Sequence, residues 1–163
     1  MFENVLYSPW RMKYILAEKN NSCIFCLPQE QDAEHFVVHR SEHSFVILNL
    51  FPYNNGHLMV VPLRHVALLG DLSIEETANL FALVRRTEIV LRKIYHPEGI
   101  NVGINIGKAA GAGIDDHLHI HLIPRWEGDT NFMTSVSGTR VIPEDFTKTY
   151  QVLKAGFDNE ECK

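Results

Sequence analysis

Short runs of Val, Ile and Phe, bounded by turn-forming residues, recur along most of the chain. They cover residues 35–40, 44–50, 57–62, 99–107 and 117–126. β-branched and aromatic residues in runs of this length are typical of strands, and the sequence FPYNNG before the third run is typical of a turn. The pattern therefore predicts a sheet of about five strands.

A helical period replaces this pattern over residues 72–95, where Ser73 and Glu76 form the sequence of a capping box. The residues expected on the buried face are Leu80, Phe81, Val84, Leu91 and Tyr95. Shorter helices are predicted after Ser8 and Pro9 and over residues 143–153. The elements together predict an α+β fold: an antiparallel sheet with one long helix packed on it and short terminal helices.

Composition places the chain among ordinary globular domains. It has 163 residues, of which 45% are hydrophobic and 21% charged, so a single domain spanning residues 1–163 is expected. The net charge of −5 at pH 7 argues against a broad contact with nucleic acid or an anionic membrane. The sequence shows no secretion-signal pattern and no apolar run of membrane-spanning length, so a cytoplasmic protein is expected.

His117, His119 and His121 occupy every second position of the last predicted strand. In an extended chain, side chains at i, i+2 and i+4 share one face and are about 6–7 Å apart. The intervening aliphatic residues then point the opposite way, into a core. This alternation predicts a half-buried strand that presents three imidazoles in a row.

Three interpretations of this row are open. The imidazoles can be surface residues without a function, or two of them can share a metal ion with Asp115, Asp116 or His57. In the third, a neutral imidazole attacks phosphorus and forms an N–P bond that a second nucleophile breaks, while a neighbour moves the proton. The loop GKAAGAG, residues 107–113, favours the third, because its backbone N–H groups and Lys108 can approach an anion.

The sequence HLHIHLI, residues 117–123, resembles the signature of the histidine triad (HIT) superfamily of nucleotidyl hydrolases and transferases. FVILNLFPYNNGHLMVVPLRH is similar to the family's strand–turn–strand, and NVGINIGKAAGAG to the strand and loop before the triad. LYSPWRMKYI, LNLFPYNNGHLMVVP and PRWEGDTNF are similar to the branch that contains microbial diadenosine tetraphosphate phosphorylases and related HIT hydrolases. The resemblance covers most of residues 45–126 and implies a HIT-like fold.

The resemblance also implies a role for each histidine. His119 would be the nucleophile that forms a nucleotidyl-histidine intermediate. His121 would bind phosphate oxygens and assist proton transfer, and His57 would contact the triad from the adjacent strand. His117 would be structural or a metal ligand.

Substrate contacts follow from the same resemblance. Asn49 stands where the family binds the ribose hydroxyls, and a short amide suits a vicinal diol. Leu48 and its apolar neighbours would flank the purine, while Lys108 and the backbone of Gly111 and Gly113 would contact phosphate. Many family members carry Gln, Ser or Thr in this loop. Here small residues take the place of that polar side chain, which favours access for inorganic phosphate as the second nucleophile.

Cys23 and Cys26 have the C-x-x-C spacing of half a zinc site. From the residues alone, His35 and His39 are candidates to complete the site, and two reduced thiols without a metal are the alternative.

The resemblance implies another completion, by His65 and His117. A structural zinc there would dock the N-terminal segment, residues 1–35, on the sheet. No catalytic metal is expected at the triad, although Mg²⁺ can accompany a polyphosphate.

The function expected from this resemblance is cleavage of dinucleoside polyphosphates, such as diadenosine tetraphosphate, by a nucleotidyl hydrolase or transferase with water or phosphate as acceptor. The expected partners are a purine nucleotide or dinucleoside polyphosphate and a second copy of the chain, with the sheet extended across the two-fold axis. Nucleic acid and membrane are not expected as partners. A nucleoside phosphoramidase of the same superfamily and a non-catalytic purine-nucleotide-binding protein are the alternatives.

Overall fold

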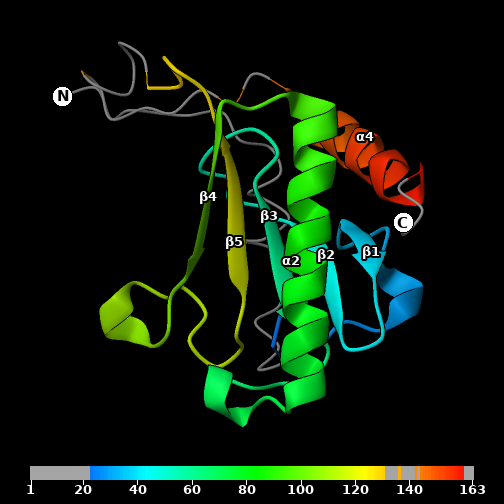
Figure 1. Ribbon diagram of the computed structural model, residues 1–163, viewed down its shortest axis with the longest axis vertical. Coiled ribbons are helices and arrows are strands. Elements are labelled where there is room, and N and C mark those ends of the chain that lie inside the picture. The colour runs from blue at the N-terminus through cyan, green and yellow to red at the C-terminus, as the bar shows by residue number, and fades with distance from the viewer. Residues whose placement is uncertain (1–22, 131–135, 137–141, 143, 160–163) are drawn as a thin grey trace, which may run out of the picture.

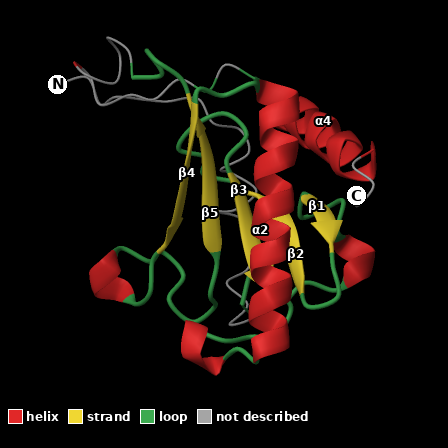
Figure 2. Ribbon diagram, viewed as in Figure 1, coloured by secondary structure: helices red, strands yellow, loops and turns green. Residues whose placement is uncertain are grey.

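The computed structural model of the protein is a five-stranded antiparallel sheet with two helices on one face (Figures 1 and 2). The structure describes residues 23–130, 136, 142 and 144–159. The strands are β1 (Val37–Arg40), β2 (Ser44–Leu48), β3 (Leu58–Pro62), β4 (Gly99–Ile104) and β5 (Ile120–Arg125), in the spatial order β1-β2-β3-β5-β4. The long helices are α2 (Ile74–Tyr95) and α4 (Phe146–Asn159). Short 3-10 turns cover Gln29–Gln31, Leu69–Asp71 and Lys108–Ala110. The predicted α+β fold is confirmed.

The two faces of the sheet carry separate apolar clusters. One lies between the sheet and the helices and includes Leu118, Ile120 and Leu122. The other lies on the opposite face, where Phe25 packs with residues such as Phe45. Because successive side chains of a strand point to opposite faces, the histidines that alternate with Leu118 and Ile120 lie on the Phe25 side.

Helix α2 begins at the predicted capping box. The Ser73 hydroxyl accepts from the backbone N–H of Glu76 at 3.1 Å, and the Glu76 carboxylate accepts from the backbone N–H of Ser73 at 2.7 Å. The buried face differs from the predicted one, since it contains Leu83, whereas Phe81 is 48% exposed. Phe81 follows Leu80 by one residue and so lies roughly 100° around the helix from it. The prediction was therefore wrong for Phe81, and the buried face of α2 is rotated away from it toward Leu83.

Several element boundaries differ from the prediction, most of all at β5, β4 and the C-terminal helix. β5 begins at Ile120, so His117 and His119 precede it, and the backbone N–H of Leu118 instead donates to the carbonyl of Val66 at 2.6 Å. β4 ends at Ile104, before the predicted end at residue 107. The C-terminal helix continues to Asn159. The helix predicted after Ser8 lies outside the described residues.

None of the helices in the described ranges combines the length and apolar character needed to cross a bilayer.

Candidate active site and metal centre

The pairing of β3 with β5 brings His57 to His121. Met59 on β3 lies opposite His121 on β5, and His57 immediately precedes β3. The His57 Nε2 and His121 Nδ1 atoms are 2.9 Å apart, and His57 is fully buried. The two imidazoles, 64 residues apart in sequence, are therefore hydrogen-bonded neighbours.

The partners of these rings determine which nitrogen carries each proton. The backbone N–H of Tyr53 donates to His57 Nδ1 at 3.1 Å, so Nδ1 is the acceptor and Nε2 of the neutral ring carries the proton. His57 Nε2–H then donates to His121 Nδ1. Neutral His121 consequently carries its proton on Nε2, where it can be donated to a substrate oxygen.

His119 has the tautomer that a nucleophile requires. Its Nδ1 lies 2.9 Å from the carbonyl oxygen of His117, which can only accept, so Nδ1 carries the proton. The lone pair of the neutral ring is therefore on Nε2. The rings of His119 and His121 are 4.8 Å apart between centroids and nearly perpendicular. Phe25 packs on His119 at 5.2 Å between ring centroids.

Burial keeps two of the site's imidazoles neutral. Burial, and then the proximity of His121 and His119, lowers the pKa of His57 to about 3. Burial, and then His119, lowers the pKa of His121 to about 4. Both rings are uncharged near pH 7, in agreement with the tautomers that their partners require.

The free energy of unfolding is expected to fall as the pH is lowered from about 6.5, the ordinary pKa of histidine. Below that pH the unfolded chain binds protons that folded His57 and His121 do not bind until about pH 3 and 4. Stability is therefore highest above about pH 6.5. Below it, each of the two histidines lowers the free energy of unfolding by up to about 1.4 kcal/mol per pH unit. Urea unfolding at pH 7, 6 and 5 measures the decline. His57→Gln should make it shallower, and an identical slope in this variant would contradict the prediction.

The other predicted substrate residues are only partly brought together. The Asn49 amide nitrogen lies 3.2 Å from His57 Nδ1, and its oxygen accepts from the backbone N–H of Phe51 at 2.9 Å. Asn49 therefore lies beside the histidines. Leu48 is 1% exposed in the cluster under α2. It faces away from the histidines, because consecutive strand residues alternate between faces.

The loop before the triad is an exposed turn. Lys108 begins a 3-10 turn that covers Lys108–Ala110 and is followed by Gly111, where φ is +85°. The Lys108 ammonium lies 3.7 Å from the Asp115 carboxylate, and Gly113 is also exposed. The described contacts do not join this loop to the histidines, so its expected contact with phosphate remains a prediction.

Four residues come together into a group with metal-ligand geometry: Cys23, Cys26, His65 and His117. Their ligand atoms all lie within 4.8 Å of one another. Cys23 Sγ is 3.2 Å from His117 Nδ1, and Cys26 Sγ is 3.4 Å from His65 Nδ1. Tetrahedral zinc with bonds of about 2.3 Å to sulfur and 2.0–2.1 Å to nitrogen separates its ligand atoms by about 3.3–3.8 Å. The donor set fits zinc, and the Cys23–His117 and Cys26–His65 separations are close to this spacing.

The outer shell of this group also suits a metal. His117 Nε2 lies 3.0 Å from the carbonyl oxygen of Pro62, so Nε2 carries the proton and Nδ1 presents its lone pair to the group. Burial lowers the pKa of His117, which favours the neutral form that a metal requires. His117 thus joins the two sites, since its side chain faces the cysteines and its carbonyl holds His119.

The alternative ligands lie elsewhere. His39 stacks on Phe157 at 5.3 Å and accepts from Arg86 at 2.8 Å, while His35 lies 3.3 Å from Gln31 Oε1. Among the described residues, the Cys23 group is the only set of three or more His, Cys, Asp or Glu that could share an ion. Among these residues, the cysteines do not form a ligand group with His35 or His39, and the triad does not form one with Asp115.

Sequence reasoning missed three contributors to the site. Phe25 lies between the two cysteines and packs on His119, and its position within C-x-x-C was a usable signal. The backbone N–H of Tyr53 and the carbonyl of Pro62 orient His57 and His117. Nearly every residue has a backbone N–H and carbonyl, so the sequence contains no signal for these two contacts.

These features define a class of protein: an α+β domain that gathers histidines from two adjacent strands and from the residues that lead into them, on the sheet face opposite its long helix. The chain belongs to the HIT domain family, whose model matches residues 30–128.

Relatives share most of the chain. The AP-4-A phosphorylase of Mycobacterium tuberculosis is 40% identical over 158 residues, which cover 91% of this chain and 81% of the relative. The asymmetrical bis(5'-nucleosyl)-tetraphosphatase of Schizosaccharomyces pombe is 38% identical over 93 residues, 57% of this chain and 50% of the relative. The crystal structure of a Zn-bound histidine triad family protein from Mycobacterium smegmatis superposes with a TM-score of 0.68 at 31% identity, covering 85% and 94% of the two chains.

Proposed function

We propose that the protein is a nucleotidyl hydrolase or transferase that cleaves dinucleoside polyphosphates such as diadenosine tetraphosphate. The observation that carries the proposal is the arrangement of the His119 and His121 imidazoles side by side, with 4.8 Å between their ring centroids. His119 presents the lone pair of Nε2, and His121 presents the proton of Nε2. A nucleophile next to a hydrogen-bond donor for the phosphate oxygens suits transfer of a nucleotidyl group.

The proposed reaction has two steps. His119 Nε2 attacks the α-phosphorus, so that an N–P bond forms while the P–O bond breaks and the polyphosphate leaves as an anion, with the Nε2–H of His121 donating a hydrogen bond to the leaving oxygen. An acceptor oxygen, from water or phosphate, then attacks the same phosphorus, the N–P bond breaks, and any proton that the acceptor loses goes to solvent. His119 therefore ends each turnover as it began.

The names of two relatives support this substrate class, since one is an AP-4-A phosphorylase and the other a bis(5'-nucleosyl)-tetraphosphatase. The position of Asn49 beside His57 supports a ribose contact next to the reacting phosphate. A homodimer is proposed through β4, which forms one end of the sheet and carries Val102, 53% of it exposed. An unpaired strand edge can extend the sheet into a second copy.

We also propose a structural zinc at Cys23, Cys26, His65 and His117. Four protein ligands leave no open coordination position, so the ion would dock the segment around Cys23 on the sheet and would not bind substrate. The Zn-bound relative from Mycobacterium smegmatis supports this assignment.

Product analysis distinguishes the two acceptors. Diadenosine tetraphosphate is expected to give AMP and ATP with water, and ADP and ATP with inorganic phosphate. We expect phosphorolysis to dominate at millimolar phosphate, because small residues replace the polar side chain that the loop before the triad often carries. Chromatography of the products with and without phosphate is the measurement. Failure to consume the substrate under either condition would refute the proposed substrate class.

A further inference from the structure

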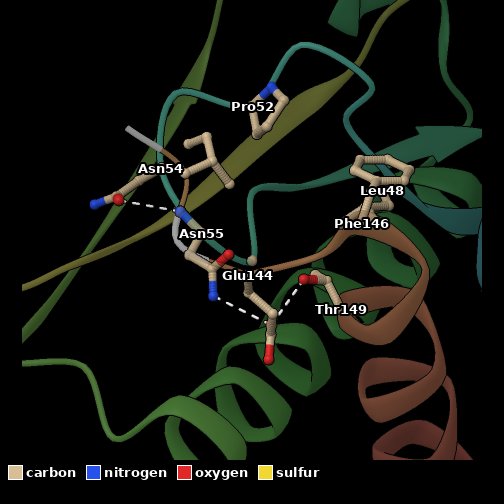
Figure 3. A pocket seen from close by; sticks show the side chains of 9 residues that line it. Leu48, Pro52, Asn54, Asn55, Glu144, Phe146 and Thr149 are labelled. Carbon is tan, nitrogen blue, oxygen red and sulfur yellow. Dashed lines mark hydrogen bonds between the residues drawn. The ribbon is translucent and has the colours of Figure 1, made fainter. Parts of the chain in front are cut away.

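Glu144 lies two residues before the first residue of α4 and accepts three hydrogen bonds on one carboxylate oxygen. The donors are Asn55 Nδ2 at 3.2 Å, the Tyr95 hydroxyl at 2.8 Å and the Thr149 hydroxyl at 2.7 Å. Figure 3 shows Asn55 and Thr149 reaching the carboxylate from opposite sides. The turn before β3, the end of α2 and the start of α4 therefore meet at a single side chain.

Gly56 allows the same turn to approach α2 closely, because it has no side chain. Its φ is +70°, and a Cβ atom there would lie 2.9 Å from the Tyr95 ring. Tyr95 thus packs on the backbone of Gly56 and donates its hydroxyl to Glu144, while Glu144 accepts from Asn55. This closed ring of contacts fixes the two residues that precede His57.

The carboxylate is held as an acceptor. Burial alone would raise its pKa, but the hydrogen bonds from Thr149, Tyr95 and Asn55 outweigh burial, and the pKa of Glu144 is lowered. A charged acceptor makes stronger hydrogen bonds than a neutral one. Glu144 is therefore suited to anchor the turn.

The anchored turn ends at the histidine that orients the proton donor. His57 follows Gly56 directly, accepts from the backbone N–H of Tyr53 and donates to His121. A displacement of the turn would lengthen both hydrogen bonds and release His121 from the tautomer with its proton on Nε2.

We propose that Glu144 is a positioning residue for the reaction: through Asn55 and Tyr95 it holds His57, and through His57 it orients His121. The proposal rests on the proposed function for its kinetic consequence. It adds a residue that does not touch the histidines and that lies at the start of the last helix.

Asn55→Ala and Glu144→Ala should each lower kcat for diadenosine tetraphosphate by about 10- to 100-fold, the cost of a small misplacement of a catalytic group. KM should stay within about twofold, because ground-state binding is unchanged. Tyr150→Phe is the matched control, since it removes a hydroxyl of α4 whose hydrogen bond goes to the carbonyl of Val37. This control should keep the wild-type kcat.

A double-mutant cycle separates positioning from a loss of stability. In a His57→Gln background, Asn55→Ala should lower kcat by less than about twofold further, because the residue through which it acts is already gone. Equal losses of kcat in the wild-type and His57→Gln backgrounds would overturn the proposal.

Amide hydrogen exchange tests the anchor without any turnover, and so separates its failure from failure of the proposed function. The Tyr53 N–H should exchange at least about tenfold faster in Asn55→Ala than in the wild type, since it is bonded to His57 in the anchored turn. Tyr150→Phe should leave this rate unchanged. A wild-type exchange rate in Asn55→Ala would overturn the proposal, even if diadenosine tetraphosphate proved not to be the substrate.

Discussion

His119→Ala is expected to lower turnover of diadenosine tetraphosphate by roughly 10⁴-fold or more, because the variant lacks the only group proposed to form the covalent bond to phosphorus. Affinity for AMP should change by less than about threefold, equivalent to about 0.65 kcal/mol. The fold should persist, since the core uses the opposite side of this segment, where Leu118 and Ile120 pack under α2. Steady-state kinetics and calorimetric titration with AMP measure the two effects.

Two further variants serve as comparisons for His119→Ala. His121→Ala should be slower than wild type but not inactive, because water can replace the hydrogen bond that His121 donates to the leaving oxygen. His35→Ala should be unaffected, since that imidazole contacts Gln31 away from the site. Trapping with radiolabelled substrate should label wild-type protein and not His119→Ala. Normal turnover in His119→Ala would end the proposed mechanism.

Cys23→Ser is expected to reduce bound zinc below half an equivalent and to lower the free energy of unfolding by roughly 3 kcal/mol or more. For a domain of this size, that loss corresponds to a fall in Tm of about 6–12 °C. The physical reason is the span of the site, which ties Cys23 to His117, 94 residues away. Metal analysis and thermal unfolding are the measurements.

Loss of the metal should also slow turnover, since Phe25 and the carbonyl of His117 both contact His119. The effect should be smaller than that of removing His119 itself, because the nucleophile remains. His35→Ala is the control, since that imidazole contacts Gln31 and not the cysteines, and it should retain both zinc and stability. A full equivalent of zinc in Cys23→Ser, or less than half an equivalent in the wild type, would refute the structural zinc.

Local sequence patterns were sufficient for much of the fold. Val, Ile and Phe runs between turn residues predicted the strands, and the capping box at Ser73 marked the start of α2 correctly. Both depend on interactions within a few residues, which a sequence displays directly. The prediction was wrong for Phe81, because the exact rotation of α2 depends on how the sheet and α4 pack against it.

The chain's own pattern determined that three imidazoles would share one side of a segment, since alternation with Leu118 and Ile120 follows from strand geometry alone. Only the tertiary structure decided the partners of each imidazole: His117 contacts the cysteines, His121 accepts from His57, and His119 bonds through Nδ1 to the carbonyl of His117. These assignments rest on contacts between residues far apart in the chain and on backbone groups such as the carbonyl of Pro62. Register and packing bring such partners together, and neither can be read from the spacing of residues within one strand.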